Sequence, residues 1–158
     1  MSPKETPNKM KKLILSLCFL SACLAQAGRQ PNIIFILVDD QGYYDLGCYG
    51  ATEVKTPQID AMAKEGMRFT DFYSAYCVCS ASRAALMTGC YQPRISMPGV
   101  LGPKSKIALH PDEVTIADLL KDRGYATQCV GKWHLGDHPD TLPTSQGFDH
   151  YFGYPYSN

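Results

Sequence analysis

The sequence predicts an α/β fold with a mixed, mostly parallel sheet flanked by helices. The apolar run over residues 32–38 is continuous and rich in β-branched side chains, which is typical of a central parallel strand buried on both faces. A helical pattern over residues 116–123 leads directly into a second strand pattern over residues 125–130. Two adjacent carboxylates end the first run, and ligands bind at the carboxyl ends of the strands in such sheets.

Charge and composition argue against one class of partner. The 158 residues carry 15 Lys and Arg against 15 Asp and Glu, so the chain has no basic excess to attract nucleic acid. Hydrophobic residues make up 45% of the chain, which is ordinary for a globular protein. We therefore expect a globular fold that does not bind nucleic acid.

Residues 1–27 are predicted to form a signal peptide rather than part of the fold. Basic residues precede an apolar run over residues 13–22, which is too short to span a bilayer. Residues 25–27 (Ala-Gln-Ala) match a small-x-small cleavage site. The folded part would then cover residues 28–158, with no transmembrane span.

The leader also admits a second interpretation. Residues 20–23 (Leu-Ser-Ala-Cys) match a bacterial lipobox, which would make Cys23 the lipidated first residue of an anchored protein. Translation from Met1 or from Met10 is compatible with either interpretation. Both predict an exported bacterial protein, whether periplasmic, extracellular or anchored by lipid.

Asp39 and Asp40 follow the first predicted strand directly. Adjacent carboxylates at the end of a buried strand are costly unless a positive group neutralises them. Their oxygens suit a hard divalent cation such as calcium or magnesium. The alternative is a solvated turn after the strand.

Residues 56–66 are predicted to form a helix, with Thr56 as its N-cap, Pro57 in its first turn and Gly66 at its end. Residues 67–73 then alternate like a strand and lead toward the next motif. The apolar face of the helix should pack in the core: Ile59, Met62 and Ala63.

A loop running into a short helix is predicted over residues 79–89 (C-S-A-S-R-A-A-L-M-T-G), with Gly89 in the left-handed closing position. Cys79 would face the unpaired N–H groups and the positive end of the helix dipole, and both favour an anion. Arg83 lies four residues on and returns to the same face. This arrangement suits a nucleophile that meets an oxyanion. The alternative is a buried cysteine beside an ordinary helix.

Residues 131–136 (G-K-W-H-L-G) follow the strand predicted over residues 125–130. Side chains two apart in an extended segment share a face, so Lys132 and His134 should point together while Trp133 points into packing. A lysine and a histidine paired in this way at a strand end are candidates for binding an anion.

These segments together resemble the type I sulfatases. The family signature is C-x-P/A-S-R followed by a short run that ends in Thr-Gly, and this chain has Ala81 where many members have proline. The G-K-W-H-L-G segment and a G-F-D-x-x-x-G segment over residues 147–153 agree with the family in order and spacing. The resemblance covers residues 31–158. Five residues fall on the signature: Cys79, Ser82, Arg83, Thr88 and Gly89.

The resemblance implies an alkaline-phosphatase-like fold, of which this chain would be the incomplete, amino-terminal part. It implies hydrolysis of an aryl or carbohydrate sulfate ester. It also implies that a formylglycine-generating enzyme oxidises Cys79 to formylglycine, the catalytic aldehyde. Asp39, Asp40 and the modified residue at position 79 would be ligands of a calcium ion.

The remaining site residues take their roles from the same resemblance. Arg83 and Lys132 would stabilise charge on the transferring group, and His134 would bind the sulfate or assist proton transfer. Ser157 matches a stretch in which some arylsulfatases place a serine that contacts the substrate. Further calcium ligands of the family have no match here, so we expect the 158-residue chain alone to be inactive.

Alternatives remain open beside this interpretation. One is a phosphonate or phosphodiester hydrolase of the same superfamily, some of which also use formylglycine. Another is a secreted protein without enzymatic activity, or an inactive fragment, in which Cys79 stays a thiol. Zinc bound by Cys77, Cys79 and Cys90 is a weaker alternative, because the spacing fits no common zinc motif. Four other cysteines could pair or stay thiols: Cys48, Cys77, Cys90 and Cys129.

Overall fold

The computed structural model describes residues 30–103 and 105–157, which divide into two units at Val38. The predicted signal peptide over residues 1–27 lies outside the described residues, and so does the lipobox with Cys23. None of the helices in the described ranges has the length and apolarity needed to cross a bilayer.

The first unit contributes one described segment, residues 30–38, which has no strand assignment. The prediction of a buried strand over residues 32–38 is therefore wrong for this structure, and Ile34 is 84% exposed. A strand exists only where its N–H and C=O groups pair with a neighbouring strand, whatever its side chains prefer. The apolar side chains of this segment lie unburied as a result.

The second unit begins with two short 3-10 turns and a helix that was predicted. The turns η1 (Tyr43–Asp45) and η2 (Gly47–Tyr49) precede α2 (Pro57–Glu65), which Thr56 and Gly66 bound as expected. The Thr56 hydroxyl does not cap the helix; it accepts a 2.8 Å hydrogen bond from the N–H of Gly47. Helix α2 is thus tied to η2 by polar groups.

The predicted core face of α2 is not buried. Ile59 is 41% and Met62 63% exposed, and Ala63 is half-buried. Asp60, on another face, accepts a 2.6 Å hydrogen bond from the N–H of Cys48. The helix therefore meets its neighbour through Thr56 and Asp60, and the apolar stripe that predicted core packing is left exposed.

Residues 67–73 form no strand, which corrects a second prediction. Their carbonyl groups accept hydrogen bonds from side chains instead: Tyr49 donates to the carbonyl of Phe69 at 2.6 Å, and Tyr43 to that of Phe72 at 3.0 Å. Side-chain donors that satisfy the backbone in this way compete with strand pairing.

Helix α3 (Cys79–Thr88) forms where it was predicted. Val78 is its N-cap, so Cys79 is its first residue, and Gly89 closes it with φ of 68°. The 3-10 turn η3 (Gln92–Ile95) follows.

Helix α4 (Ile116–Lys121) is two residues shorter than predicted. Thr115 caps it reciprocally with Asp118, and the turn that follows ends at Gly124 with φ of 81°. The chain then enters β1, and after two more 3-10 turns, η4 (Pro139–Thr141) and η5 (Pro143–Ser145), it enters β2.

The strands β1 (Gln128–Lys132) and β2 (His150–Tyr154) form a parallel pair. The register runs from Gln128 opposite His150 to Lys132 opposite Tyr154. Strand β1 starts later than the predicted residues 125–130, and β2 was not predicted as a strand. Parallel pairing between strands flanked by helices confirms the predicted α/β class.

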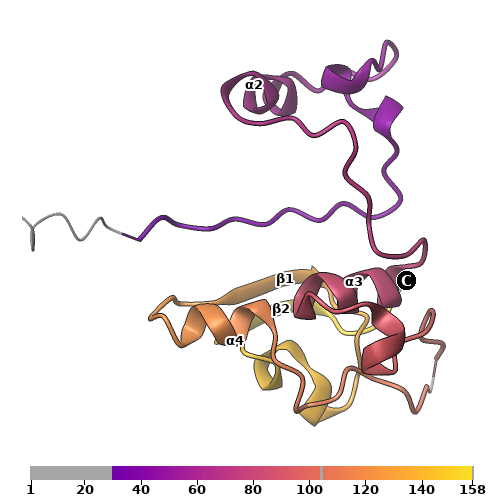
Figure 1. The fold of residues 1–158 in the computed structure, drawn as a ribbon, viewed down its shortest axis with the longest axis vertical. Coiled ribbons are helices and arrows are strands. Elements are labelled where there is room, and N and C mark those ends of the chain that lie inside the picture. The colour runs from indigo at the N-terminus through magenta and orange to yellow at the C-terminus, as the bar shows by residue number, and fades with distance from the viewer. Residues whose placement is uncertain (1–29, 104, 158) are drawn as a thin grey trace, which may run out of the picture. The chain divides into compact units, whose positions relative to one another are not determined.

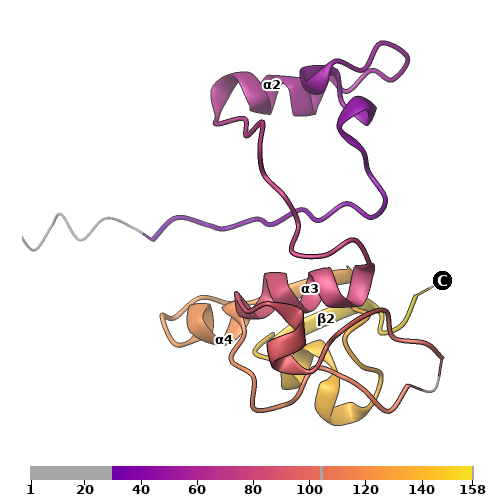
Figure 2. The same cartoon turned by 45° about the vertical axis from the view of Figure 1, so that its right-hand side comes forward.

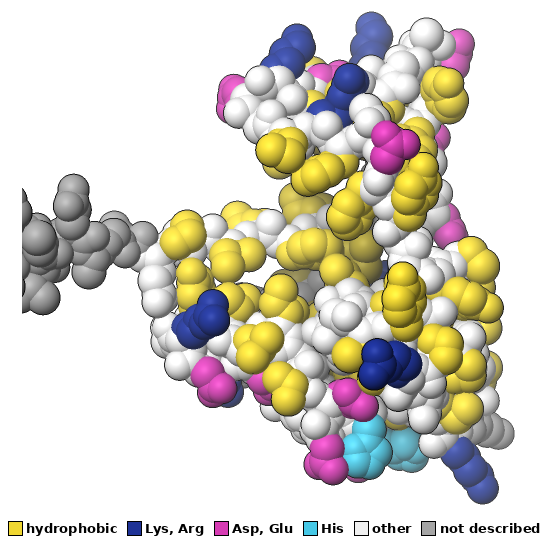
Figure 3. All heavy atoms as spheres, in the orientation of Figure 1, with side chains coloured by type: hydrophobic (Ala, Val, Ile, Leu, Met, Phe, Trp, Pro, Cys, Tyr) yellow, Lys and Arg dark blue, Asp and Glu magenta, His cyan; other side chains and the backbone are white. Residues whose placement is uncertain are grey.

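One hydrophobic cluster joins α3, both strands and the loops between them. In two views α3 lies beside the β1–β2 pair and near α4 (Figures 1 and 2). Trp133 is 3% exposed, which confirms its predicted packing, while many large apolar side chains elsewhere lie on the surface (Figure 3). The buried members of the cluster are Ala84, Ile95, Met97, Leu101, Leu109, Trp133 and Leu135.

Candidate active site

The candidate site lies at the carboxyl end of β1. Lys132 is the last residue of this strand, and two backbone hydrogen bonds continue beyond it: the N–H of Trp133 donates to Tyr154, and that of His134 donates to Pro155. The chain turns sharply here because His134 has φ of 60°, a left-handed conformation that costs free energy for a non-glycine residue. This turn sets the direction of the histidine side chain.

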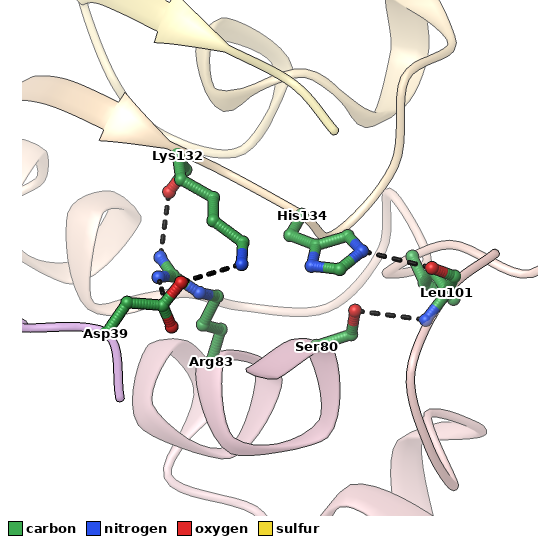
Figure 4. A network of polar contacts seen from close by, with 6 residues as sticks. All are labelled: Asp39, Ser80, Arg83, Leu101, Lys132 and His134. Atoms are coloured by element: carbon green, nitrogen blue, oxygen red, sulfur yellow. Dashed lines mark hydrogen bonds and ion pairs between the residues drawn. The ribbon is translucent and has the colours of Figure 1, made fainter. Parts of the chain in front are cut away.

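Three charged side chains meet at this strand end (Figure 4). Nζ of Lys132 donates to one carboxylate oxygen of Asp39 at 2.7 Å, and Nη2 of Arg83 donates to the other at 3.4 Å. Nη1 of Arg83 also donates to the carbonyl oxygen of Lys132 at 2.8 Å. Helix α3, strand β1 and the segment at Asp39 are therefore joined by one polar network.

The network carries an excess of positive charge. The side chains of Arg83 and Lys132 are only 12% and 9% exposed, and Asp39 supplies a single negative charge. The hydrogen bond from Lys132, with the charges of Lys132 and Arg83, lowers the pKa of Asp39, although partial burial opposes this shift. Nε of Arg83 is buried and has no partner among the described residues. An anion would supply the missing charge and acceptor.

His134 stands next to this network with its ring held on two sides. Its Nε2 lies 3.0 Å from the carbonyl oxygen of Leu101, and the Tyr156 ring meets it edge-on at 5.1 Å between centroids. Burial lowers the pKa of His134, and the positive charges of Lys132 and Arg83 add to the shift, while the contacts with Leu101 and Asp39 oppose it. The surroundings of His134 therefore favour its neutral form over the charged one.

The Nδ1 atom of His134 has no hydrogen-bond partner within the described part of the chain, although it is buried. A carbonyl oxygen can only accept, so Nε2 carries the proton in its contact with Leu101 and Nδ1 carries a lone pair. Figure 4 shows the Nδ1 edge of the ring turned toward Lys132 and Arg83. The ring thus presents a proton acceptor to the network.

Cys79 begins α3 as a half-buried free thiol. Its N-cap, Val78, has no side-chain acceptor, so the first-turn N–H groups lack a side-chain cap. All described cysteines are free, including Cys77 and Cys90, and no group of three potential ligands that could hold a metal forms in the described ranges. The zinc and disulfide alternatives therefore find no support.

The network leaves out three residues that were predicted for the site. Asp40 is exposed with φ of 55°, and no hydrogen bond or ion pair of its side chain is present in the described structure. The same holds for the Cys79 thiol and for the Ser157 hydroxyl within the described residues, and both residues are half-buried. The structure thus joins Asp39, Arg83 and Lys132, with His134 beside them.

The donor atoms of Asp39 and Asp40 fit calcium in kind. Carboxylate oxygens are the ligands that calcium prefers, and the ion takes about six to eight of them. Two carboxylates supply at most four oxygens, and those of Asp39 already accept hydrogen bonds from Lys132 and Arg83. The two residues therefore suit a part of a calcium site.

Sequence reasoning missed Leu101 and Tyr156, which contact the His134 ring, and Ser80, which accepts a hydrogen bond from the N–H of Leu101. Leu101 acts through its backbone, so its side chain carries no signal of the contact. Ser80 lies within the predicted motif, where a serine after the cysteine looks like an ordinary first-turn residue.

Comparisons with known proteins place the chain in a family. The sequence model of the family described as Sulfatase matches residues 31–158. The chain is 51% identical over 142 residues to arylsulfatase A of Homo sapiens, covering 88% of this chain and 28% of that protein. It is 44% identical to N-acetylgalactosamine-6-sulfatase of Canis lupus familiaris, covering 90% of this chain and 28% of that protein.

Solved structures resemble the chain in the same way. The crystal structure of PsFucS1 sulfatase from Pseudoalteromonas sp. matches with a TM-score of 0.76 at 37% identity, covering 98% of this chain and 31% of that one. The chain therefore spans about a third or less of the length of the relatives it matches.

Proposed function

This chain belongs to the sulfatase family, and from that premise we propose that the whole protein hydrolyses sulfate esters. The observation that carries the proposal is the pair of half-buried cations, Arg83 and Lys132, which share the carboxylate of Asp39. The names of the relatives support an aryl or carbohydrate sulfate as substrate.

Arg83 and Lys132 would bind the sulfuryl oxygens and stabilise the charge that develops on them during transfer. Groups fixed in advance in a partly dry site stabilise a transition state more than mobile groups in water. Both side chains are held in place by Asp39 and by the Lys132 carbonyl, so the cations need little reorganisation. His134, whose Nδ1 has no partner among the described residues, would accept a proton in the site.

The nucleophile would come from Cys79. Formylglycine, formed there by a formylglycine-generating enzyme, would supply a hydrated aldehyde as the attacking group. The position of Cys79 at the start of α3 supports this role, because uncapped first-turn N–H groups favour a nearby anion. Ser157 remains a candidate for contact with the alcohol part of the substrate.

A calcium ion would complete the site, with Asp39 and Asp40 among its ligands. When bound, it would lower the pKa of the nucleophile and neutralise charge on the substrate. Calcium should raise the melting temperature of the whole protein, and Asp40→Asn should reduce that rise. Asp71→Asn, in an exposed loop, is the matched control. An equal rise in all three proteins would remove Asp40 from the ligand set.

The predicted leader supports export of the whole protein from a bacterial cell. In an alternative form of this proposal, the exported protein is anchored by a lipid on Cys23. Accessibility of the protein to protease in intact spheroplasts tests export, and a Cys23→Ser change tests anchoring.

The decisive experiment produces the whole protein together with the converting enzyme and assays an aryl sulfate. We expect turnover, a peptide mass that shows an aldehyde at position 79, and no activity in Cys79→Ala. Cys77→Ala, two residues before the signature, should keep both the aldehyde and the activity. An unmodified Cys79 in an active protein would contradict the proposed nucleophile.

The same cations would also bind a phosphonate or phosphodiester. Turnover of an aryl phosphonate measured beside the aryl sulfate separates the two reactions, because the family proposal requires the sulfate to be the better substrate. A protein that carries the aldehyde but turns over only the phosphonate would overturn the proposed substrate class.

A further inference from the structure

We propose that Ser80 is a positioning residue for His134, acting through the peptide groups of Leu101. The effect on reaction rate rests on the proposed function, but the effect on the histidine ring follows from geometry alone. Ser80 lies on α3, and His134 lies just after β1. Both form a hydrogen bond with the backbone of Leu101 (Figure 4). The charged side chains of the site do not account for either hydrogen bond.

The first half of this link is a buried hydrogen bond. Ser80 is fully buried, and its hydroxyl oxygen accepts from the N–H of Leu101 at 3.1 Å. Leu101 is 7% exposed and belongs to the hydrophobic cluster, so water has little access to its backbone. Removal of the acceptor would leave a buried N–H group unpaired, which is costly.

The second half is the contact between the Leu101 carbonyl oxygen and Nε2 of His134 at 3.0 Å. This contact selects the tautomer with the proton on Nε2, since a carbonyl oxygen accepts only. Leu101 thus donates its N–H to Ser80 on α3 and accepts at its carbonyl oxygen from His134. Ser80 therefore fixes the position of the Leu101 carbonyl, which is the hydrogen-bond partner of His134.

The consequence falls on Nδ1, the atom that faces the charged network. Nδ1 is buried without a partner among the described residues, so its lone pair is available only while the proton stays on Nε2 and the ring keeps its place. Tyr156 restrains the ring from another side, but an aromatic edge does not select a tautomer. That selection falls to the Leu101 carbonyl, which Ser80 holds.

The test is nitrogen-15 NMR of the histidine rings in the whole protein, with the His134 signals assigned by their loss in His134→Gln. In the unmodified sequence we expect one neutral tautomer, with the proton on Nε2 and protected from exchange with water. In Ser80→Ala we expect that proton to exchange at least about fivefold faster, the change that the loss of one hydrogen bond of typical net strength produces. The ring shifts should move toward a mixture of tautomers.

Thr127→Ala is the matched control. The Thr127 hydroxyl is also buried and accepts a backbone N–H bond, from Asp149 at 3.0 Å, but it lies on no path to His134. It should lower overall stability without changing the His134 signals. Ser80→Thr retains the hydroxyl and should keep the original tautomer.

Three results would overturn the proposal. One is a proton on Nδ1 in the unmodified sequence, which needs no variant and holds even if Ser80→Ala does not fold. Another is unchanged exchange and unchanged shifts in a folded Ser80→Ala. The third is an equal effect of Thr127→Ala, which would show that general loosening moves the signals. None of these readouts depends on sulfate ester hydrolysis.

Discussion

Lys132 and Asp39 stand 93 residues apart in the sequence, yet Nζ of Lys132 donates a 2.7 Å hydrogen bond to a carboxylate oxygen of Asp39. The other carboxylate oxygen of Asp39 lies 3.4 Å from Nη2 of Arg83. The Asp39 carboxylate therefore holds two cations in place, one at a strand end and one on a helix. Their fixed positions matter because a cation that is already in place stabilises a transition state without first being moved.

The first prediction concerns Lys132. Lys132→Ala in the whole protein should lower kcat/KM on an aryl sulfate by roughly a hundredfold or more, or ~3 kcal/mol, because one preorganised charge is lost. The melting temperature should change little, since the Lys132 backbone keeps its strand pairing. Lys121→Ala is the control: Lys121 also pairs with a carboxylate, that of Asp149 at 2.8 Å. Activity that survives Lys132→Ala nearly intact would remove Lys132 from the site.

The second prediction concerns His134 and pH. Burial and the nearby positive charges of Lys132 and Arg83 outweigh the contacts with Leu101 and Asp39 and hold the folded-state pKa of His134 below its ordinary value of 6.5. The unfolded chain therefore takes up the proton first as pH falls, and stability declines below about pH 6.5. The decline is at most about 1.4 kcal/mol per pH unit until the folded state also binds the proton.

Urea unfolding of the whole protein between pH 7.5 and 5 measures this decline. His134→Gln should lose the His134 contribution and show a flatter profile over that range. His150→Gln, which replaces an exposed histidine on β2, should retain it. Equal slopes in His134→Gln and the unmodified protein would mean that His134 titrates freely.

Local sequence signals predicted the helices well. Gly89 adopts the left-handed conformation predicted for it at the end of α3, and Thr56 and Gly66 bound α2 as expected. These features depend on neighbours a few residues away, so the sequence contains them in full.

Contacts between distant segments were predicted less well. Residues 32–38 have the side chains of a buried strand, but a strand also needs a partner, which side-chain pattern alone does not reveal. The apolar face of α2 was likewise predicted to be buried, but Ile59 and Met62 are exposed. Hydrogen bonds of Thr56 and Asp60 determine which side of the helix contacts η2.

The candidate site shows both cases. The spacing of Lys132 and His134 indicated an anion site, and the structure gives Lys132 the neighbours Asp39 and Arg83. The left-handed turn at His134 and the Leu101 carbonyl that holds its ring had no signal in the sequence, since both are properties of the backbone.

The third prediction concerns Trp133, which separates the two site residues in sequence. Trp133→Ala should lower the free energy of unfolding by roughly 3 kcal/mol, because the buried ring packs edge-on against Phe148 at 6.2 Å. Trp133→Phe retains an aromatic ring but loses the N–H that donates to Thr141 at 2.8 Å, so about 1 kcal/mol should be lost. Denaturant unfolding of the whole protein measures both changes. Equal stability of the alanine variant would contradict the core position of Trp133.

The fourth prediction concerns Asp149 and acid. Hydrogen bonds from Lys121 and then from the backbone and hydroxyl of Thr127 lower the pKa of Asp149 to about 2, although desolvation opposes this shift. A carboxyl whose folded-state pKa is lowered stabilises the fold above its ordinary pKa of 3.8 and loses that contribution as pH falls toward 2. Lys121→Ala should raise the pKa of Asp149 and weaken this acid-dependent contribution.

Carboxyl carbon-13 NMR titration between pH 5 and 2 tests this directly, with the Asp149 signal assigned by its loss in Asp149→Asn. In Lys121→Ala the midpoint of that signal should move up toward 3.8. Lys64→Ala is the control, since Lys64 is an exposed lysine in the last turn of α2 and forms no ion pair with any described residue. Because Lys121 lies on α4 and Asp149 directly precedes β2, an unchanged midpoint would mean that this ion pair does not join the helix to the strand in solution.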